Sequence, residues 1–106
     1  MSFVALTCLL IAIDGDTLRC GKERIRLLGI DAPEMPGHCR RGRKCVEGDP
    51  YASKASLASM IEGSAQIERR GRDRYGRTLG KVRVNGVDLS KAQVSFGMAT
   101  AVKRWE

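Results

Sequence analysis

Three charged residues around one short apolar run carry the clearest chemical signal in this sequence. Residues 25–34 read IRLLGIDAPE, so Arg26 lies inside the run while Asp31 and Glu34 follow it. Oxygen ligands suit a hard cation, a guanidinium suits a phosphate, and a carboxylate can accept a proton. The stretch therefore indicates phosphate chemistry assisted by a metal ion, and a solvated turn with a stray arginine is the simpler alternative.

A second acidic turn comes earlier in the chain. Asp14 and Asp16 flank Gly15, and Thr17 follows. Asp-Gly is common in turns for conformational reasons alone, so this turn is informative only beside the first one. Together they suggest that Asp16 and Asp31 share one calcium ion, with a backbone carbonyl and water completing the oxygen shell.

A third segment is rich in arginine. Residues 71–81 read GRDRYGRTLGK, and Arg77 follows Gly76. We expect a tight turn to place Arg77 at the start of a strand, where a guanidinium can orient a phosphate by bidentate contact. Tyr75 either touches a sugar or base of the substrate, or is a partly buried turn residue.

The composition fits one small basic domain covering residues 1–106. Hydrophobic residues make up 42% and charged residues 29%, which is typical of a globular chain. Lys and Arg outnumber Asp and Glu by 19 to 12, a net charge of +7. This charge favours a polyanionic partner, with nucleic acid ahead of a membrane surface, over a merely basic globular protein.

The 4 cysteines are many for so short a chain. Their spacing is not C-x-x-C and there is a single histidine, so disulfides are a better interpretation than a zinc site or free thiols. A hairpin loop at residues 13–15, with Gly15 at positive φ, would place Cys8 opposite Cys20. The other pair, Cys39–Cys45, would pin a basic surface loop. Disulfides imply an oxidising compartment, so we expect a secreted or periplasmic protein.

The opening residues 1–13 are apolar but do not read as a targeting segment. They lack a basic start and a small-residue cleavage site, and they are too short to span a bilayer. We interpret them as part of the mature domain and expect any signal peptide to be absent from this sequence.

Turn and periodicity signals predict five strands, at residues 3–13, 16–20, 23–31, 64–70 and 77–84. Such a meander suggests a small closed barrel, and the pattern alone does not separate it from an open sheet backed by helices.

Two helices are expected beside these strands. Asp49 and Gly63 suit the caps of the first helix, whose expected apolar positions are Leu57, Ala58 and Ile61. Asp88 suits the cap of a second, shorter helix that ends at Gly97, with Leu89, Ala92 and Phe96 on one face.

The motifs DGDTL, RLLGIDAPE and DRYGRTLGKV, in this order and spacing, resemble the thermonuclease family of staphylococcal nuclease-like domains over roughly residues 4–102. The resemblance implies a mainly β, α+β fold: a five-stranded OB-fold barrel, of the oligonucleotide-binding type, with two flanking helices. Because the sequence stops at Glu106, we expect it to lack the family's C-terminal helix. The family's stacking tyrosine has no counterpart, and Lys103 and Trp105 occupy this region.

The resemblance also implies a reaction, since family members are calcium-dependent phosphodiesterases that cut DNA and RNA and leave 3′-phosphate ends. The matched positions then have these roles: Glu34 as general base, Arg26 and Arg77 as phosphate arginines, Asp16, Asp31 and the carbonyl of Ala32 as Ca²⁺ ligands, Arg74 and Tyr75 as substrate contacts, and Asp14 and Thr17 beside the metal ligands.

We therefore expect a calcium-dependent nuclease of low sequence specificity that acts as a monomer without a membrane partner. The alternative is a catalytically silent nucleic-acid-binding module of the OB type. A third possibility is an interaction module whose arginines bind acidic protein. Calcium-dependent release of nucleotides would separate the first from the other two, and salt-sensitive binding without cleavage would favour the second.

Overall fold

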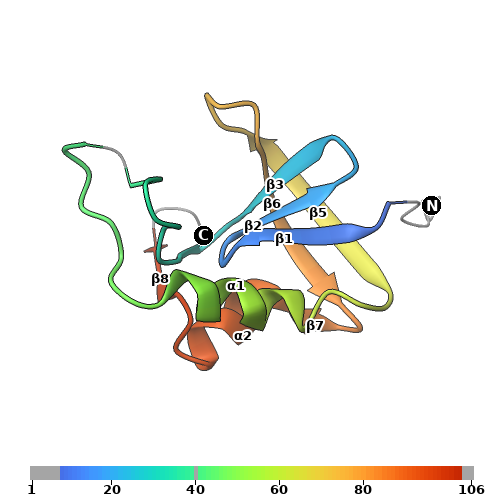
Figure 1. The fold of residues 1–106 in the computed structure, drawn as a ribbon. Coiled ribbons are helices and arrows are strands. Elements are labelled where there is room, and N and C mark those ends of the chain that lie inside the picture. The colour runs from blue at the N-terminus through green and yellow to red at the C-terminus, as the bar shows by residue number, and fades with distance from the viewer. Residues whose placement is uncertain (1–7, 40, 104–106) are drawn as a thin grey trace.

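The computed structural model describes residues 8–39 and 41–103, and it combines two sheets with two helices (Figure 1). The strands are β1 (Leu10–Asp14), β2 (Thr17–Cys20), β3 (Glu23–Leu27), β4 (Ile30–Asp31), β5 (Ala65–Arg72), β6 (Thr78–Val84), β7 (Val87–Asp88) and β8 (Thr100–Ala101), and the helices are α1 (Pro50–Ala58) and α2 (Leu89–Ser95).

The larger sheet has the order β1-β2-β3-β6-β5, and β7 pairs with β6. Its ladders are antiparallel except for the one between β3 and β6, which is parallel. A parallel pair needs a long connection, and here the chain passes through α1 and β5 between the two strands. The expected mixed α+β fold with two helices is confirmed. Within residues 8–39 and 41–103, no ladder joins β1 to β5.

The first hairpin is tighter than the predicted three-residue loop at 13–15. Asp14 lies opposite Thr17, so Gly15 and Asp16 alone form the turn. Gly15 is not among the glycines with positive φ, so that expectation is wrong as well. The ladder takes up the extra residue as an irregularity at Ile13, where a bulge increases the local twist.

The shorter turn also changes which residue of β1 pairs with Cys20, the partner in the predicted disulfide. Leu10, rather than Cys8, lies opposite Cys20. The Cys8–Cys20 bridge is nevertheless present, because the two Cα atoms are 5.2 Å apart, within the usual range for a disulfide. The other predicted bridge, Cys39–Cys45, is present with a Cα separation of 6.1 Å. Of the predicted strand 3–13, residues 3–7 lie outside the described residues.

The predicted strand 23–31 is two strands. Leu28 and Gly29 form a turn between β3 and β4, and Gly29 has a φ of 84°, which ends the extended run. β4 leaves the main sheet and pairs with β8, so Asp31 lies opposite Thr100. The strand β8 lies in a segment for which the sequence predicts only a short tail. The other predicted strands differ from those observed by one or two residues at their ends.

Helix α1 begins as predicted and ends early. The carboxylate of Asp49 accepts hydrogen bonds from the amides of the first turn at 2.9 and 3.2 Å. The helix ends at Ala58, and Ser59 rather than Gly63 is its C-cap, because the Ser59 hydroxyl and amide both bond to Ser56. As a result Ala58 is exposed, so its predicted place in the apolar face is wrong.

Helix α2 is capped by Asp88, as predicted, and buries Leu89. Phe96 was expected on the same buried face but is 61% exposed, because the helix ends at Ser95 and Phe96 is already the C-cap residue. The buried position one turn after Leu89 is taken by Gln93, which is fully enclosed.

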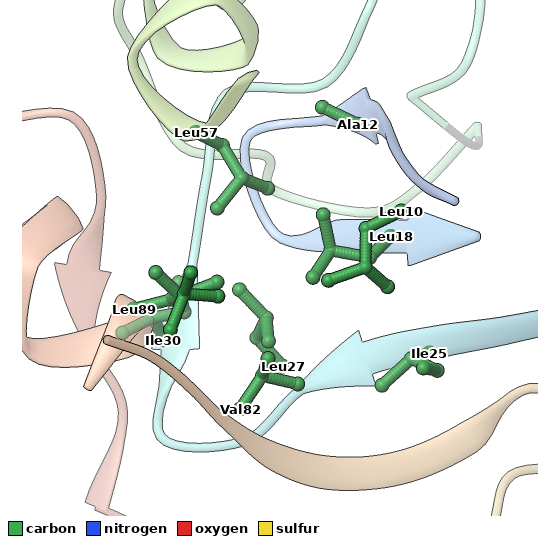
Figure 2. Close-up of a cluster of buried hydrophobic side chains, with 10 residues drawn as sticks. Leu10, Ala12, Leu18, Ile25, Leu27, Ile30, Leu57, Val82 and Leu89 are labelled. Atoms are coloured by element: carbon green, nitrogen blue, oxygen red, sulfur yellow. The ribbon is translucent and has the colours of Figure 1, made fainter. Parts of the chain in front are cut away.

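The hydrophobic core joins both helices to the sheet. Figure 2 shows Leu57 of α1 and Leu89 of α2 near Leu18, Leu27 and Val82 of the strands, all of them fully buried. Full burial of one such side chain contributes about 1.5–3 kcal/mol. This packing holds β1 against α1, and the acidic hairpin turn lies at the end of β1. No helix among the described ranges is long and apolar enough to cross a membrane.

Candidate active site

The predicted site residues come from four segments that meet around one cleft of about 1090 Å³. The hairpin turn after β1, the strand β3, the segment after β4 and the turn between β5 and β6 all contribute to its lining. The predicted residues that line the cleft are Asp14, Thr17, Arg26, Glu34, Arg74, Tyr75 and Arg77.

Arg26 links the two acidic turns from inside the sheet. It is only 4% exposed, and its Nη2 lies 3.3 Å from Asp16 Oδ2 and 3.6 Å from Asp31 Oδ1. Burial lowers the pKa of Arg26 below its usual value, while the charges of Asp16 and Asp31 oppose that shift. The guanidinium remains protonated near neutral pH, so a charge inside an apolar strand is offset by two carboxylates.

Asp16 is oriented by bonds from three neighbours. Its Oδ2 accepts a hydrogen bond from the backbone amide of Ala32 at 2.9 Å, and its Oδ1 accepts one from the Thr17 hydroxyl at 3.1 Å. The Asp16 amide donates to Asp14 Oδ1 at 3.1 Å. These bonds tie the hairpin turn to the segment after β4, so the two acidic turns form one unit.

Burial and the neighbouring carboxylates raise the pKa of two carboxyl groups in this unit, those of Asp14 and Glu34. Burial, and then the charge of Asp16, raise the pKa of Asp14 to about 7. Burial also raises the pKa of Glu34, with Asp16 and Asp31 adding to the shift and Arg43 and Arg26 opposing it. A proton acceptor works best when its pKa approaches the working pH, so the direction of the Glu34 shift suits a general base.

Arg43 contacts the site although no sequence motif assigned it there. Its Nη1 donates to Glu34 Oε1 at 3.1 Å, and its Nη2 lies 3.4 Å from Asp31 Oδ2. The sequence shows Arg43 only as one charge in a basic loop. The signal that could have found it is the Cys39–Cys45 pair, which closes that loop directly after the acidic turn.

The turn between β5 and β6 is organised by Asp73, which the sequence did not single out. Its Oδ1 accepts the amides of Tyr75 and Arg77 at 2.9 Å each, and its Oδ2 accepts Arg77 Nε at 2.7 Å. Burial would raise the pKa of Asp73, but these bonds from Arg77 and Tyr75 hold it below its usual value. Asp73 thereby fixes the direction of the Arg77 guanidinium.

Tyr75 lies beneath two guanidinium groups of the same turn. The Cζ atoms of Arg74 and Arg77 are 5.1 and 5.6 Å from the centre of its ring, within the range of a cation–π contact. The Tyr75 carbonyl also accepts a hydrogen bond from Arg24. The turn therefore presents several arginines around one half-buried aromatic ring, a combination suited to phosphate and base contacts.

The carboxylates of this site could bind a hard divalent cation only if backbone and water oxygens completed the set of ligands. Among residues 8–39 and 41–103, no group of three or more His, Cys, Asp and Glu side chains could hold a metal ion by itself. Four carboxyl groups nevertheless lie together here, from Asp14, Asp16, Asp31 and Glu34, and among the described residues Arg26 and Arg43 are the two guanidinium groups that form ion pairs with them. A calcium ion would offset this excess, and two aspartates with a carbonyl and water form a reasonable oxygen shell.

Comparison with known proteins shows which family this sequence resembles. Residues 24–106 match the family model described as staphylococcal nuclease homologue. The chain is 36% identical to the succinoglycan biosynthesis protein ExoI of Rhizobium meliloti over 90 residues, which cover 82% of this chain and 47% of that protein.

Two further relatives carry names that refer to nucleic-acid cleavage. Identity is 35% over 106 residues with an uncharacterized endonuclease of Haemophilus influenzae, covering 93% of this chain and 54% of the relative. Identity is 33% over 105 residues with endonuclease YncB of Bacillus subtilis, covering 90% of this chain and 47% of the relative. The chain thus spans about half the length of these relatives. Because the family model covers most of the chain, including the acidic turn after β4 and the arginine turn, the protein belongs to the staphylococcal nuclease homologue family.

Proposed function

We propose that this protein is a nuclease, a hydrolase of phosphodiester bonds in nucleic acid. The observation that carries the proposal is one cleft lined by Arg26, Glu34 and Arg77. Asp16 and Asp31 do not line this cleft, but both form ion pairs with Arg26. Together with the family membership, this set supplies a proton acceptor and two cations for a phosphate.

Calcium is part of the proposal. Asp16 and Asp31 would hold the ion, the carbonyl of Ala32 would add a neutral oxygen, and Asp14 and Thr17 would support Asp16 from the side. Bound calcium would polarise a phosphate oxygen as a Lewis acid.

Glu34 then takes a proton from the water that attacks phosphorus. A new bond forms between that water oxygen and phosphorus, and the bond from phosphorus to the 5′ oxygen breaks. The 5′ oxygen takes a proton from solvent water, so the products are a 3′-phosphate and a 5′-hydroxyl, and Glu34 returns its proton to solvent. Arg26 and Arg77 stabilise the additional negative charge on the phosphate oxygens during attack. Asp73 engages Arg77 through Nε, so the fork of terminal nitrogens remains for the phosphate.

The substrate range follows from what the cleft can recognise. Arg74 and Tyr75 offer a charge and a ring, which every nucleotide can use, and the chain carries a net charge of +7. We infer low sequence specificity and action on both DNA and RNA by a monomer. The two disulfides support a secreted or periplasmic location.

The decisive experiment is cleavage of plasmid DNA and of a structured RNA, with calcium and then with an added chelator. Cleavage that requires calcium and leaves 3′-phosphate ends is the expected result. The control is Glu34→Gln, which should lose about 10²–10⁴-fold in rate while still binding nucleic acid. Salt-sensitive binding without any cleavage by the parent protein would contradict the proposal and identify a silent binding module.

A further inference from the structure

The loop closed by the Cys39–Cys45 disulfide delivers Arg43 to the site. Gly42, with a φ of 82°, turns the chain just before Arg43. Both sulfur atoms of the bridge lie near the Arg43 carbonyl oxygen, at 3.6 and 3.9 Å. The bridge therefore packs directly on the backbone of Arg43 and limits where its side chain can reach.

Arg43 and Arg26 hold the same carboxylate in different ways. Arg26 contacts Asp31 from the interior, and only 5% of its side chain is exposed. Arg43 contacts Asp31 and Glu34 from the cleft, and 40% of its side chain is exposed. A half-solvated ion pair contributes little net free energy, so Arg43 can leave these carboxylates at small cost whereas Arg26 cannot.

The two carboxylates that Arg43 contacts are those assigned to the cation and to the attacking water. A cation bound to Asp31 would repel a guanidinium 3.4 Å from the same carboxylate. Once displaced, Arg43 would remain in the cleft because it is tethered by the disulfide, and the cleft also receives Arg74 and Arg77. The group best suited to receive it there is a phosphate of the nucleic acid.

We propose that Arg43 is a substrate-binding residue that competes with the divalent cation for Asp31 and Glu34 and, when displaced, binds a phosphate of the nucleic acid. This inference rests on the proposed function, because it uses the same cation and substrate. The proposed role of Arg43 differs from that of a permanent structural ion pair. Removing a structural pair would loosen the site and weaken the binding of both the cation and the nucleic acid.

The test measures each ligand separately in Arg43→Gln. Calorimetric titration with calcium alone should show affinity raised roughly two- to tenfold, because a competitor is gone. Binding of a non-cleavable single-stranded oligonucleotide at saturating calcium should weaken, and the slope of log K against log salt should fall by about 0.7, the value of one phosphate contact.

Two controls separate the specific effect from loss of charge. Arg41→Gln removes a positive charge from the same loop, and Arg41 has no ion pair within the described ranges, so its calcium affinity should stay near that of the parent. Arg83→Gln removes an exposed charge of β6 that does not line the cleft, so its salt slope should not change.

Calcium affinity that falls in Arg43→Gln, or an unchanged salt slope, would overturn this inference even if the parent protein cleaves nucleic acid. A parent that binds both ligands with the expected Arg43 effects but cleaves nothing would instead defeat the proposed activity and leave the role of Arg43 standing. The two failures are therefore distinguishable.

Discussion

The side-chain amide of Gln93 donates a hydrogen bond across 2.9 Å to the carbonyl of Gly15, joining the buried face of α2 to the turn that carries Asp14 and Asp16. The same nitrogen donates to the Ser53 carbonyl of α1, also at 2.9 Å. One glutamine thus connects both helices to the acidic hairpin turn. Its own Oε1 is buried and has no hydrogen-bond partner among the described residues, a cost that the two bonds from the nitrogen offset.

Replacing this glutamine should affect the proposed calcium site as well as stability. Gln93→Leu removes the donor to the buried carbonyl of Gly15, and an unsatisfied buried carbonyl costs about 1–3 kcal/mol. Calcium affinity should fall as well, because the turn that positions Asp16 is no longer held. Urea unfolding and calorimetric titration well below the melting temperature would measure the two effects. The matched control is Gln66→Leu on the exposed face of β5, which should change neither.

A loss of stability in Gln93→Leu with calcium affinity unchanged would show that Gln93 serves only the core. The present arrangement instead predicts that the two effects occur together, since Gly15 lies directly between the two aspartates of the turn.

The hairpin turn approaches α1 so closely that only glycine fits at position 15. A Cβ atom added to Gly15 would collide with the Ser53 hydroxyl and would lie 2.8 Å from Ala32 Cβ. Gly15→Ala should therefore destabilise the protein by about 1–3 kcal/mol, the usual cost of overpacking. Urea unfolding followed by circular dichroism would give this value.

A double-mutant cycle with Ser53→Ala tests the cause. Removing the hydroxyl relieves part of the collision, so the double variant should lose less stability than the two single variants combined. Strictly additive losses would mean that the turn moves away from α1 without strain, and the explanation by steric contact would be wrong.

How far the sequence predicts this site depends on the separation of the residues along the chain. Arg26, Asp31 and Glu34 could be grouped from sequence because they lie close together in the chain, within residues 26–34. The contacts of Gln93 with Gly15 and of Arg43 with Asp31 depend on tertiary packing, which no local pattern contains.

The errors in the predicted fold have the same origin. Asp-Gly suits both two-residue and three-residue hairpin loops, so the pairing of Asp14 with Thr17 could not be chosen from residue types. Phe96 has the right spacing for the apolar face of α2, but the helix ends one residue earlier. Residue type and periodicity predicted the two helices and the longer strands, but they missed the short strands β7 and β8 and the break between β3 and β4.

Acid stability should depend on Glu23 of β3. Its carboxylate accepts two hydrogen bonds from Arg69 at 2.7 and 2.8 Å and one from the Thr78 hydroxyl at 2.7 Å. The bonds from Arg69 are the main reason that the pKa of Glu23 is lowered from 4.5 to about 2. Since the folded pKa is the lower one, this stabilisation is fully present above about pH 4.5 and is lost as the pH falls towards about 2.

Glu23→Gln should therefore be less stable than the parent at neutral pH and should approach it in acid. The difference should not exceed about 1 kcal/mol, because half of the Arg69 side chain is exposed and solvent weakens the pair. Urea unfolding across the acid range measures it, and Arg69→Gln should show the same pH dependence. A difference between parent and variant that is constant with pH would rule out this ion pair as the source.

Arg77 should be sensitive to a change that preserves its charge. Asp73 binds Arg77 through Nε and leaves a planar fork towards the cleft, whereas lysine has neither an Nε nor a fork. Arg77→Lys should slow single-turnover cleavage of a labelled oligonucleotide by about 10²–10³-fold, the range found when one transition-state donor is removed. Binding of a non-cleavable analogue should weaken much less, because the positive charge remains.

The control lies in the same turn. Arg74 is exposed and, within the part of the chain that the structure describes, its side chain contacts only the ring of Tyr75, so Arg74→Lys should have a much smaller effect on the rate. Asp73→Asn should reproduce part of the Arg77→Lys defect, since it weakens the carboxylate that directs the guanidinium. If Arg77→Lys cleaves as fast as the parent under single-turnover conditions, the guanidinium fork of Arg77 does not stabilise the transition state, and this part of the proposed mechanism is wrong.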